Sequence, residues 1–165
     1  MRIGVVGDIH GNYEGLCEAV RRMGRLDLLL FTGDGYREIS RLSGESNLPI
    51  EGVAGNCDFA AAYPLEQTMG YDGCRILLTH GHKYGVKNGL TRIGLAAREK
   101  QVDLVVFGHT HQALDTDWYG VRLFNPGSLS LERASAGPSY GLIETDGDGI
   151  KTKIFKLASA PANHG

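Results

Sequence analysis

Short apolar runs alternate with amphipathic segments over the first two thirds of this 165-residue chain. Five of the runs predict buried strands: RIGVVGD, LLLFTGD, IEGVAGN, RILLTHG and DLVVFGHTH. Residues 12–24, 36–42 and 89–100 have apolar side chains at helical spacing and predict helices, the first with Asn12 as N-cap and Gly24 as its end. The polar, glycine-punctuated passage between the third and fourth runs carries no predicted element.

The pattern changes in the last third, where strands follow one another without helices. VRLFNPGS, YGLIETD and IKTKIFKL predict three strands, and DGDG at 146–149 predicts a hairpin turn. Strand–helix units followed by antiparallel strands predict an α/β (α+β) fold in which two packed sheets are flanked by helices. We expect a single domain over residues 1–158 and a frayed tail over 159–165.

Composition narrows the class of protein. With 42% hydrophobic and 22% charged residues, the chain is typical of a soluble globular domain. Its formal charge of −2 gives no strong nucleic-acid signature, although a local phosphate site stays open. Cys17, Cys57 and Cys74 are odd in number and form no C-x-x-C pair, which favours free thiols and a cytoplasmic location. The N-terminus turns polar too soon for a signal peptide, and the apolar runs are too short to span a bilayer, so no membrane partner is expected.

Polar side chains of metal-ligand type follow each of the five apolar runs. They are Asp8, His10, Asp34, Asn56, Cys57, Asp58, His80, His82, His109 and His111. Each has an ordinary structural explanation when taken alone, such as a turn, a helix cap or a hydrogen-bonded histidine. Because the carboxyl ends of strands in an α/β sheet share one edge, the five segments together predict one site.

The mixture of ligand types indicates which ions would bind. Two ions about 3.5–4 Å apart need a bridging carboxylate surrounded by oxygen and imidazole ligands. Imidazole with carboxylate suits Mn, Fe, Zn, Ni or Co better than Ca or Mg. A neutral Asn56 oxygen would add no negative charge, which leaves the pair positive enough to attract a phosphate.

In this order, GDIHG, GD, GNCD, THGH and GHTH resemble the motifs of the calcineurin-like metallophosphoesterase superfamily over roughly residues 3–128. Length and GNCD are most similar to its small bacterial and archaeal phosphodiesterases. The resemblance implies a four-layer αββα sandwich and two divalent transition-metal ions, with Mn²⁺ expected and Ni²⁺, Co²⁺, Zn²⁺ or Fe as alternatives. It implies that a hydroxide shared by the ions attacks the phosphorus of a small phosphodiester in line. Its ligand set is Asp8, His10 and His111 for one metal, Asn56, His80 and His109 for the other, and Asp34 as the bridge.

Cys57 departs from the pattern, because many relatives have histidine there to protonate the leaving group or contact the phosphate. A nucleophile, a soft metal ligand, a general acid and a small residue at that position are the alternatives, and we favour the small residue. Asp58 either orients a neighbouring group or is a turn residue. His82 either touches phosphate, supports His80, or is an exposed loop residue, and Arg133 either meets a substrate phosphate or is a solvated surface residue.

Two other functions fit the same fold. One is a phosphomonoesterase, and the other is a non-catalytic interaction scaffold like the retromer subunit that resembles these enzymes. A complete set of seven competent ligands favours the enzyme over the scaffold. The natural substrate and the oligomeric state, a homo-oligomer included, stay open at this point.

Overall fold

The computed structural model describes residues 1–59 and 62–158, so the expected frayed tail at 159–165 lies outside the described residues. The strands are β1 Arg2–Val6, β2 Leu28–Phe31, β3 Ile50–Gly52, β4 Glu66–Tyr71, β5 Cys74–Thr79, β6 Leu104–Val106, β7 Ala113–Trp118, β8 Val121–Pro126, β9 Ser139–Thr145 and β10 Ile150–Lys156. The helices are α1 Tyr13–Met23, α2 Tyr36–Glu45 and α3 Thr91–Glu99, with short 3-10 turns η1 His82–Tyr84 and η2 Val86–Asn88.

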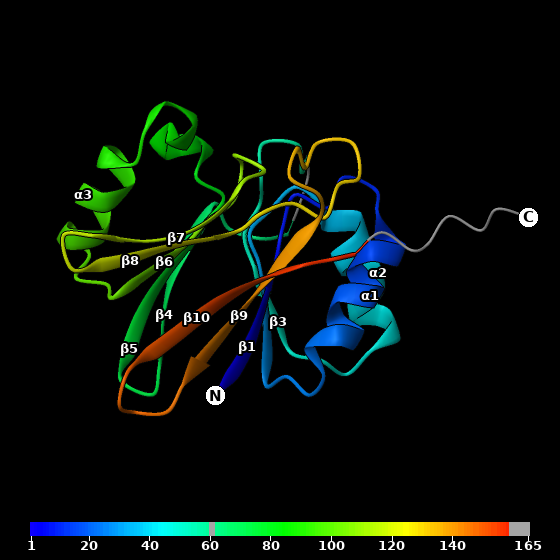
Figure 1. Cartoon of the computed structure of the whole chain (residues 1–165), viewed down its shortest axis with the longest axis horizontal. Coiled ribbons are helices and arrows are strands. Elements are labelled where there is room, and N and C mark those ends of the chain that lie inside the picture. Colours follow the sequence, from blue (N-terminus) through cyan, green and yellow to red (C-terminus); the bar gives the residue numbers. More distant parts are fainter. Residues whose placement is uncertain (60–61, 159–165) are drawn as a thin grey trace, which may run out of the picture.

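The strands form two mixed five-stranded sheets (Figure 1). The first has the order β10-β9-β1-β2-β3, in which β1, β2 and β3 are parallel and β9 is antiparallel to both of its neighbours. The second has the order β4-β5-β6-β8-β7, in which β5, β6 and β8 are parallel and the two edge strands are antiparallel to them. The predicted mixture of parallel and antiparallel strands is confirmed.

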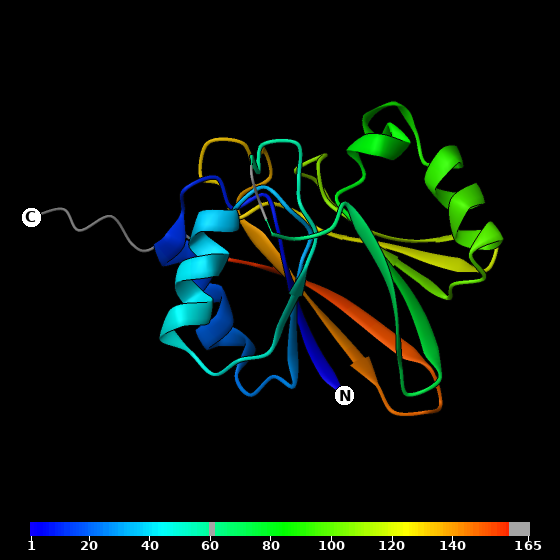
Figure 2. The ribbon, with the colours of Figure 1, turned by 180° about the vertical axis from the view of Figure 1, so that it is seen from behind.

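Three apolar clusters hold the layers together. Alternate residues of one strand point to opposite faces, so Ile3 and Val5 of β1 lie between the two sheets while Val6 faces α1 and α2. The second sheet divides in the same way, with Leu78 of β5 facing the other sheet and Leu77 facing α3. Figure 2 shows α1 and α2 on one side of the paired sheets and α3 on the other. The predicted four-layer αββα sandwich is confirmed.

The helix ends follow the local chemistry that the sequence predicts. The Asn12 side chain accepts a hydrogen bond from Gly15 N at 3.0 Å, and Gly24 ends α1 with a φ of 72°. Both predicted boundaries of α1 are therefore confirmed.

A glycine inside α3 sets how closely that helix packs. Gly94 lets α3 approach the second sheet, because an added Cβ would lie 2.4 Å from the ring of Trp118.

Two strands were not predicted. Glu66–Tyr71 and Ala113–Trp118 form the edge strands β4 and β7, and most of their side chains are only half-buried. An edge strand covered on part of its surface needs few apolar residues, so it leaves little hydrophobic signal in the sequence. The third predicted strand is also shorter than expected: β3 ends at Gly52, and the chain then turns into the loop that carries Asn56.

The parallel strands of both sheets run in the direction that brings their carboxyl ends to one edge of the molecule. The loops that follow them gather there, at the top of Figure 1. Hydrogen bonds hold neighbouring loops together at this edge, from Gly108 N to His80 O at 3.1 Å in the second sheet and from Asp8 N to Gly33 O at 2.9 Å in the first. Within the described residues, no helix has the length and apolar character needed to cross a membrane.

Candidate metal centre

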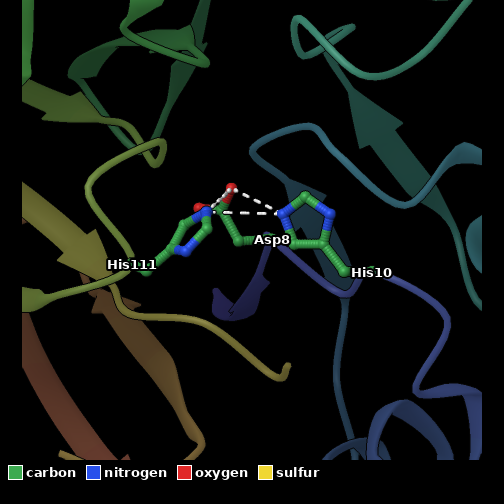
Figure 3. A group of neighbouring side chains, drawn as sticks. All are labelled: Asp8, His10 and His111. Atoms are coloured by element: carbon green, nitrogen blue, oxygen red, sulfur yellow. Dashed lines mark hydrogen bonds and ion pairs between the residues drawn. The ribbon is translucent and has the colours of Figure 1, made fainter. Parts of the chain in front are cut away.

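Three of the predicted ligands form a first group, which we call group one: Asp8, His10 and His111. Asp8 and His10 follow β1, and His111 follows β6. Their side chains point toward one another (Figure 3), with Asp8 Oδ1 at 3.2 Å from His111 Nε2 and 3.7 Å from His10 Nε2. The two imidazole nitrogens are 3.3 Å apart. One carboxylate oxygen and two imidazole nitrogens therefore converge on a single point, as ligands of one cation do.

Three further predicted ligands form group two: Asn56, His80 and His109. They follow β3, β5 and β6. His80 Nε2 lies at the centre, 2.9 Å from Asn56 Oδ1 and 3.1 Å from His109 Nδ1. This second convergence combines an amide oxygen with two imidazoles.

Asp34 lies between the two groups. Its Oδ2 atom is 3.3 Å from His80 Nε2 in group two and 3.8 Å from His10 Nε2 in group one. Its other oxygen accepts a hydrogen bond from Cys57 N at 2.8 Å. One carboxylate with its second oxygen fixed by the backbone has the arrangement that a bridging ligand requires.

The unpaired atoms of the site fit cations. Asp8 Oδ1 is buried and has no hydrogen-bond partner among the described residues, and such an atom is costly unless something binds it. Burial opposes ionisation of Asp8, but the close imidazoles of His10 and His111 outweigh it and lower the pKa of the carboxyl. Burial also opposes ionisation of Asp34, and the hydrogen bond and charge of His80 lower its pKa strongly. Both carboxylates are therefore charged at neutral pH.

The two imidazoles of group two differ in their surroundings. His80 Nδ1 donates to the carbonyl oxygen of Thr32 at 2.8 Å, so Nε2 is the nitrogen that faces the site and would bind a cation after losing its proton. Burial lowers the pKa of His80, but its hydrogen bond to Asp34 and the charges of Asp8 and Asp34 raise it above the usual value. Burial, followed by the charge of His80, lowers the pKa of His109 to about 4, so His109 is neutral and able to bind a cation.

The backbone at the site is unusual. Eight non-glycine residues in the described parts of the chain have positive φ, and five of these are predicted ligands: Asp8, His10, Asp34, His109 and His111. Such φ values are uncommon outside glycine and cluster at functional sites. Gly55 allows the close approach of the GNCD loop, because an added Cβ would lie 2.0 Å from Asp34 Oδ1. The five side chains reach the site because the surrounding fold imposes this conformation on them.

Both carboxylate oxygens of Asp58 accept hydrogen bonds from backbone N–H groups. Its Oδ2 accepts from Asp34 N at 2.7 Å and Gly55 N at 2.9 Å, and its Oδ1 accepts from Gly35 N at 2.9 Å and Tyr36 N at 3.0 Å. These four bonds connect the loop after β3 to the loop after β2 and to the first turn of α2. Asp58 therefore orients its neighbours, which was one of the two alternatives that the sequence left open.

Cys57 lies near His10 and Asp34, and His82 lies beside group two. Cys57 is exposed, and its sulfur lies within 4.8 Å of ligand atoms of His10 and Asp34. Burial, followed by the negative charge of Asp34, raises the pKa of the Cys57 thiol, which disfavours a nucleophilic thiolate. The ring of His82 packs 5.3 Å from that of His80 and 6.0 Å from that of His109, centroid to centroid, so His82 is not an exposed loop residue.

Residues beyond the predicted set also shape the site. The hydroxyl of Ser128 donates to Asp8 O at 2.7 Å and is buried, so Ser128 supports the loop after β1. Thr32 acts through its carbonyl, which side-chain patterns cannot reveal. Arg133 is exposed and lines a hollow of about 300 Å³ together with His10 and Asn12. It therefore lies beside His10 of group one.

Two adjoining groups of carboxylate and imidazole ligands at the edge of an α/β fold are typical of dinuclear metal-dependent hydrolases. The family model of the calcineurin-like phosphoesterase superfamily domain matches residues 1–148. The probable metallophosphoesterase YsnB of Bacillus subtilis is 32% identical over 159 residues, which cover 96% of this chain and 92% of YsnB. The chain belongs to the calcineurin-like phosphoesterase superfamily.

Two other proteins are similar to this chain, one in sequence and one in fold. The phosphodiesterase YfcE of Escherichia coli is 34% identical over 103 residues, which cover 57% of this chain and 52% of YfcE. The structure of Vps29 from Chaetomium thermophilum matches with a TM-score of 0.82 and 19% identity, and it covers 98% of this chain and 91% of its own. At that identity the likeness to Vps29 shows the fold alone.

Proposed function

We propose that this protein is a phosphodiesterase that hydrolyses a small phosphodiester with two divalent transition-metal ions. The observation that carries the proposal is the position of Asp34 Oδ2, which is within 4 Å of an imidazole nitrogen from each ligand group. Membership of the phosphoesterase superfamily supplies the reaction class, and the name of YfcE supports a diester substrate. Mn²⁺ is the expected ion, with Ni²⁺, Co²⁺, Zn²⁺ and Fe as alternatives, because imidazole and carboxylate ligands suit these metals.

The predicted ligands and the residues that position them would have the following roles. Group one would hold one ion, group two the other, and Asp34 would bridge them. When bound, such a pair lowers the pKa of water and neutralises charge on the non-bridging phosphate oxygens. Asp58 keeps Asp34 in position through the backbone, and Ser128 does the same for Asp8.

Two rival functions have weaker support. A scaffold rests on the fold likeness to Vps29, whereas an interaction surface alone would not need seven metal-type side chains aimed at one another. A phosphomonoesterase uses the same ions, so only the substrate preference separates it from a diesterase. The hollows beside His10 and Asp34 leave this side of the site open, and residues that could form a specificity cap are few in a chain of this length.

The proposal also includes the extent of the catalytic domain and its cellular location. We assign residues 1–158 to one catalytic domain and the protein to the cytoplasm, where its free cysteines would stay reduced. A small phosphodiester is its proposed substrate, and association of the protein into a homo-oligomer stays open.

The test compares a diester with its monoester on protein of known metal content. Chelated protein is reloaded with Mn²⁺, its metal is counted by elemental analysis, and turnover of bis(p-nitrophenyl) phosphate and p-nitrophenyl phosphate is measured. We expect two ions per chain and a higher kcat/KM for the diester. Full activity with one ion would refute the dinuclear site, and a preference for the monoester would refute the diesterase.

A matched pair of variants connects the activity to the site. His109→Ala removes a predicted ligand of group two and should abolish most turnover, while Gln112→Ala changes an exposed residue three positions along the same loop. Circular dichroism checks that both variants are folded. Equal activity in the two variants would place the chemistry elsewhere.

A further inference from the structure

A hollow of about 440 Å³ adjoins the candidate metal centre, and we call it the α2 hollow. Its lining includes the predicted ligands His10 and Asp34, the first residues of α2 and the residue after GNCD: His10, Asp34, Tyr36, Arg37, Glu38 and Phe59. A phosphate bound at the two ligand groups would therefore have one of its ester substituents beside this space.

Among the residues that line the α2 hollow, Phe59 best indicates which kind of ligand would bind there. Its side chain is 88% exposed, although a phenylalanine is normally buried in a folded protein. An exposed aromatic ring next to a binding site is a typical anchor for a ligand. The sandwich core does not use this ring, which leaves its faces free for a partner.

Tyr36 supplies a second aromatic ring, and its position is fixed. Its ring packs edge-on against Tyr63 at 5.9 Å between centroids, and Tyr63 in turn packs against the core residue Phe31 at 6.0 Å. The backbone of Tyr36 is held by Asp58 Oδ1 at 3.0 Å. The α2 hollow therefore has an aromatic wall that needs no reordering before it binds a ring.

The charges around the α2 hollow select the chemistry of its occupant. Arg37 lines it together with the carboxylates of Glu38, Asp34 and Asp58, so it has no excess positive charge for a second phosphate. A neutral flat ring suits such a space, because stacking on an aromatic side chain does not depend on charge or on one hydrogen-bond pattern.

We propose that the α2 hollow binds an ester substituent of the substrate that carries a flat ring, namely an aryl group or a nucleobase. Phe59 and Tyr36 would contact the ring while the phosphate lies at the metal centre. This substrate class rests on the proposed phosphoesterase function. It makes Phe59 a specificity-determining residue with no part in the hydrolysis itself.

Binding of product-like monoesters tests the proposal without requiring turnover. Calorimetry on Mn²⁺-loaded protein compares methyl phosphate, phenyl phosphate and thymidine 5′-monophosphate. We expect at least one ring-bearing ester to bind about tenfold more tightly than methyl phosphate, in line with the gain from base–aromatic stacking. Phe59→Ala should remove most of that advantage and leave the affinity for methyl phosphate unchanged.

A matched control separates this effect from the general loss of an exposed ring. Tyr119 is 81% exposed on the turn between β7 and β8, away from the lining of the α2 hollow, so Tyr119→Ala should keep the ring advantage. An advantage for phenyl phosphate alone supports an aryl ester, and one for the nucleotide alone supports a nucleoside ester. Equal affinities for all three ligands, or an advantage that survives Phe59→Ala, would overturn the proposal.

The two proposals can fail separately. Protein that binds ring-bearing esters through Phe59 but hydrolyses no phosphodiester would refute the proposed function and leave the α2 hollow as a ring-binding site. Protein that hydrolyses diesters and shows no ring advantage would refute only the role of Phe59.

Discussion

Replacing Asp58 by asparagine should destabilise the protein while the shape of the side chain is kept. The four backbone N–H groups of Asp34, Gly35, Tyr36 and Gly55 donate to the two carboxylate oxygens, two to each. Asparagine retains one oxygen and places an NH₂ group, itself a donor, opposite the other two N–H groups. Two donors would therefore lose their acceptor.

The expected size of the effect follows from the cost of an unpaired polar group. A buried donor without an acceptor costs about 1–3 kcal/mol, so two of them cost about 2–6 kcal/mol. These hydrogen bonds are only partly buried, so we expect a loss of stability in the lower half of that range, about 2–4 kcal/mol. Because the free energy of unfolding of a domain is about 5–15 kcal/mol, the Asp58→Asn variant should still fold.

Urea denaturation measures the free energy of unfolding of Asp58→Asn against the unaltered protein, with Asp148→Asn on the exposed 146–149 turn as the control. We also expect weaker Mn²⁺ binding with an unchanged stoichiometry, because the backbone of Asp34 loses its support. A loss of stability below about 1 kcal/mol, or one equal to that of the control, would refute the role assigned to Asp58.

Three further outcomes are expected. Cys57→Ser should keep two ions and most activity on an activated aryl diester, because serine keeps the backbone N–H that donates to Asp34. Loss of an ion would make the thiol a ligand, and inactivity with both ions bound would make it catalytic. Chelated enzyme should regain activity with Mn²⁺, Ni²⁺ or Co²⁺ better than with Ca²⁺, and equal rescue by Ca²⁺ would contradict the histidine-rich site. The metal-free protein should lose stability as pH falls from 6.5 to about 4, because in that window His109 binds a proton in the unfolded chain before it does so in the folded one. His109→Gln should flatten this slope in urea titrations, and an unchanged slope would show that other groups cause it.

The sequence predicted the strands that are buried on both faces, and it also predicted β3 and β10, the edge strands of the first sheet. β1, β2, β5 and β6 lie inside the sandwich, so nearly every residue is apolar and each run ends where the chain leaves the core. The edge strands of the second sheet, β4 and β7, were missed because EQTMGY and ALDTDW contain no apolar run, which a half-buried edge strand does not need. Their positions are determined by pairing with β5 and β8, which no local pattern contains.

The candidate site was likewise predicted only in part: the convergence of its side chains was expected, and the contacts that position them were not. Side chains that follow buried strands were expected to converge, and the structure brings six of the seven predicted ligands into two groups and places Asp34 between them. The four bonds of Asp58 could not be predicted, because their donors are backbone groups more than twenty positions earlier in the chain, apart from Gly55. The support from Ser128 likewise crosses 120 positions to Asp8.

The left-handed backbone at five predicted ligands limits how this centre could be transplanted. Each such residue costs about 1 kcal/mol outside a structure that enforces it, since L-amino acids avoid that region. Short peptides copying GDIH or GHTH, or grafts into a flexible loop, would relax to ordinary backbone angles and aim their histidines apart. A working copy would have to include the paired ends of β1, β2, β5 and β6, which makes the smallest transferable unit of this centre most of the sandwich.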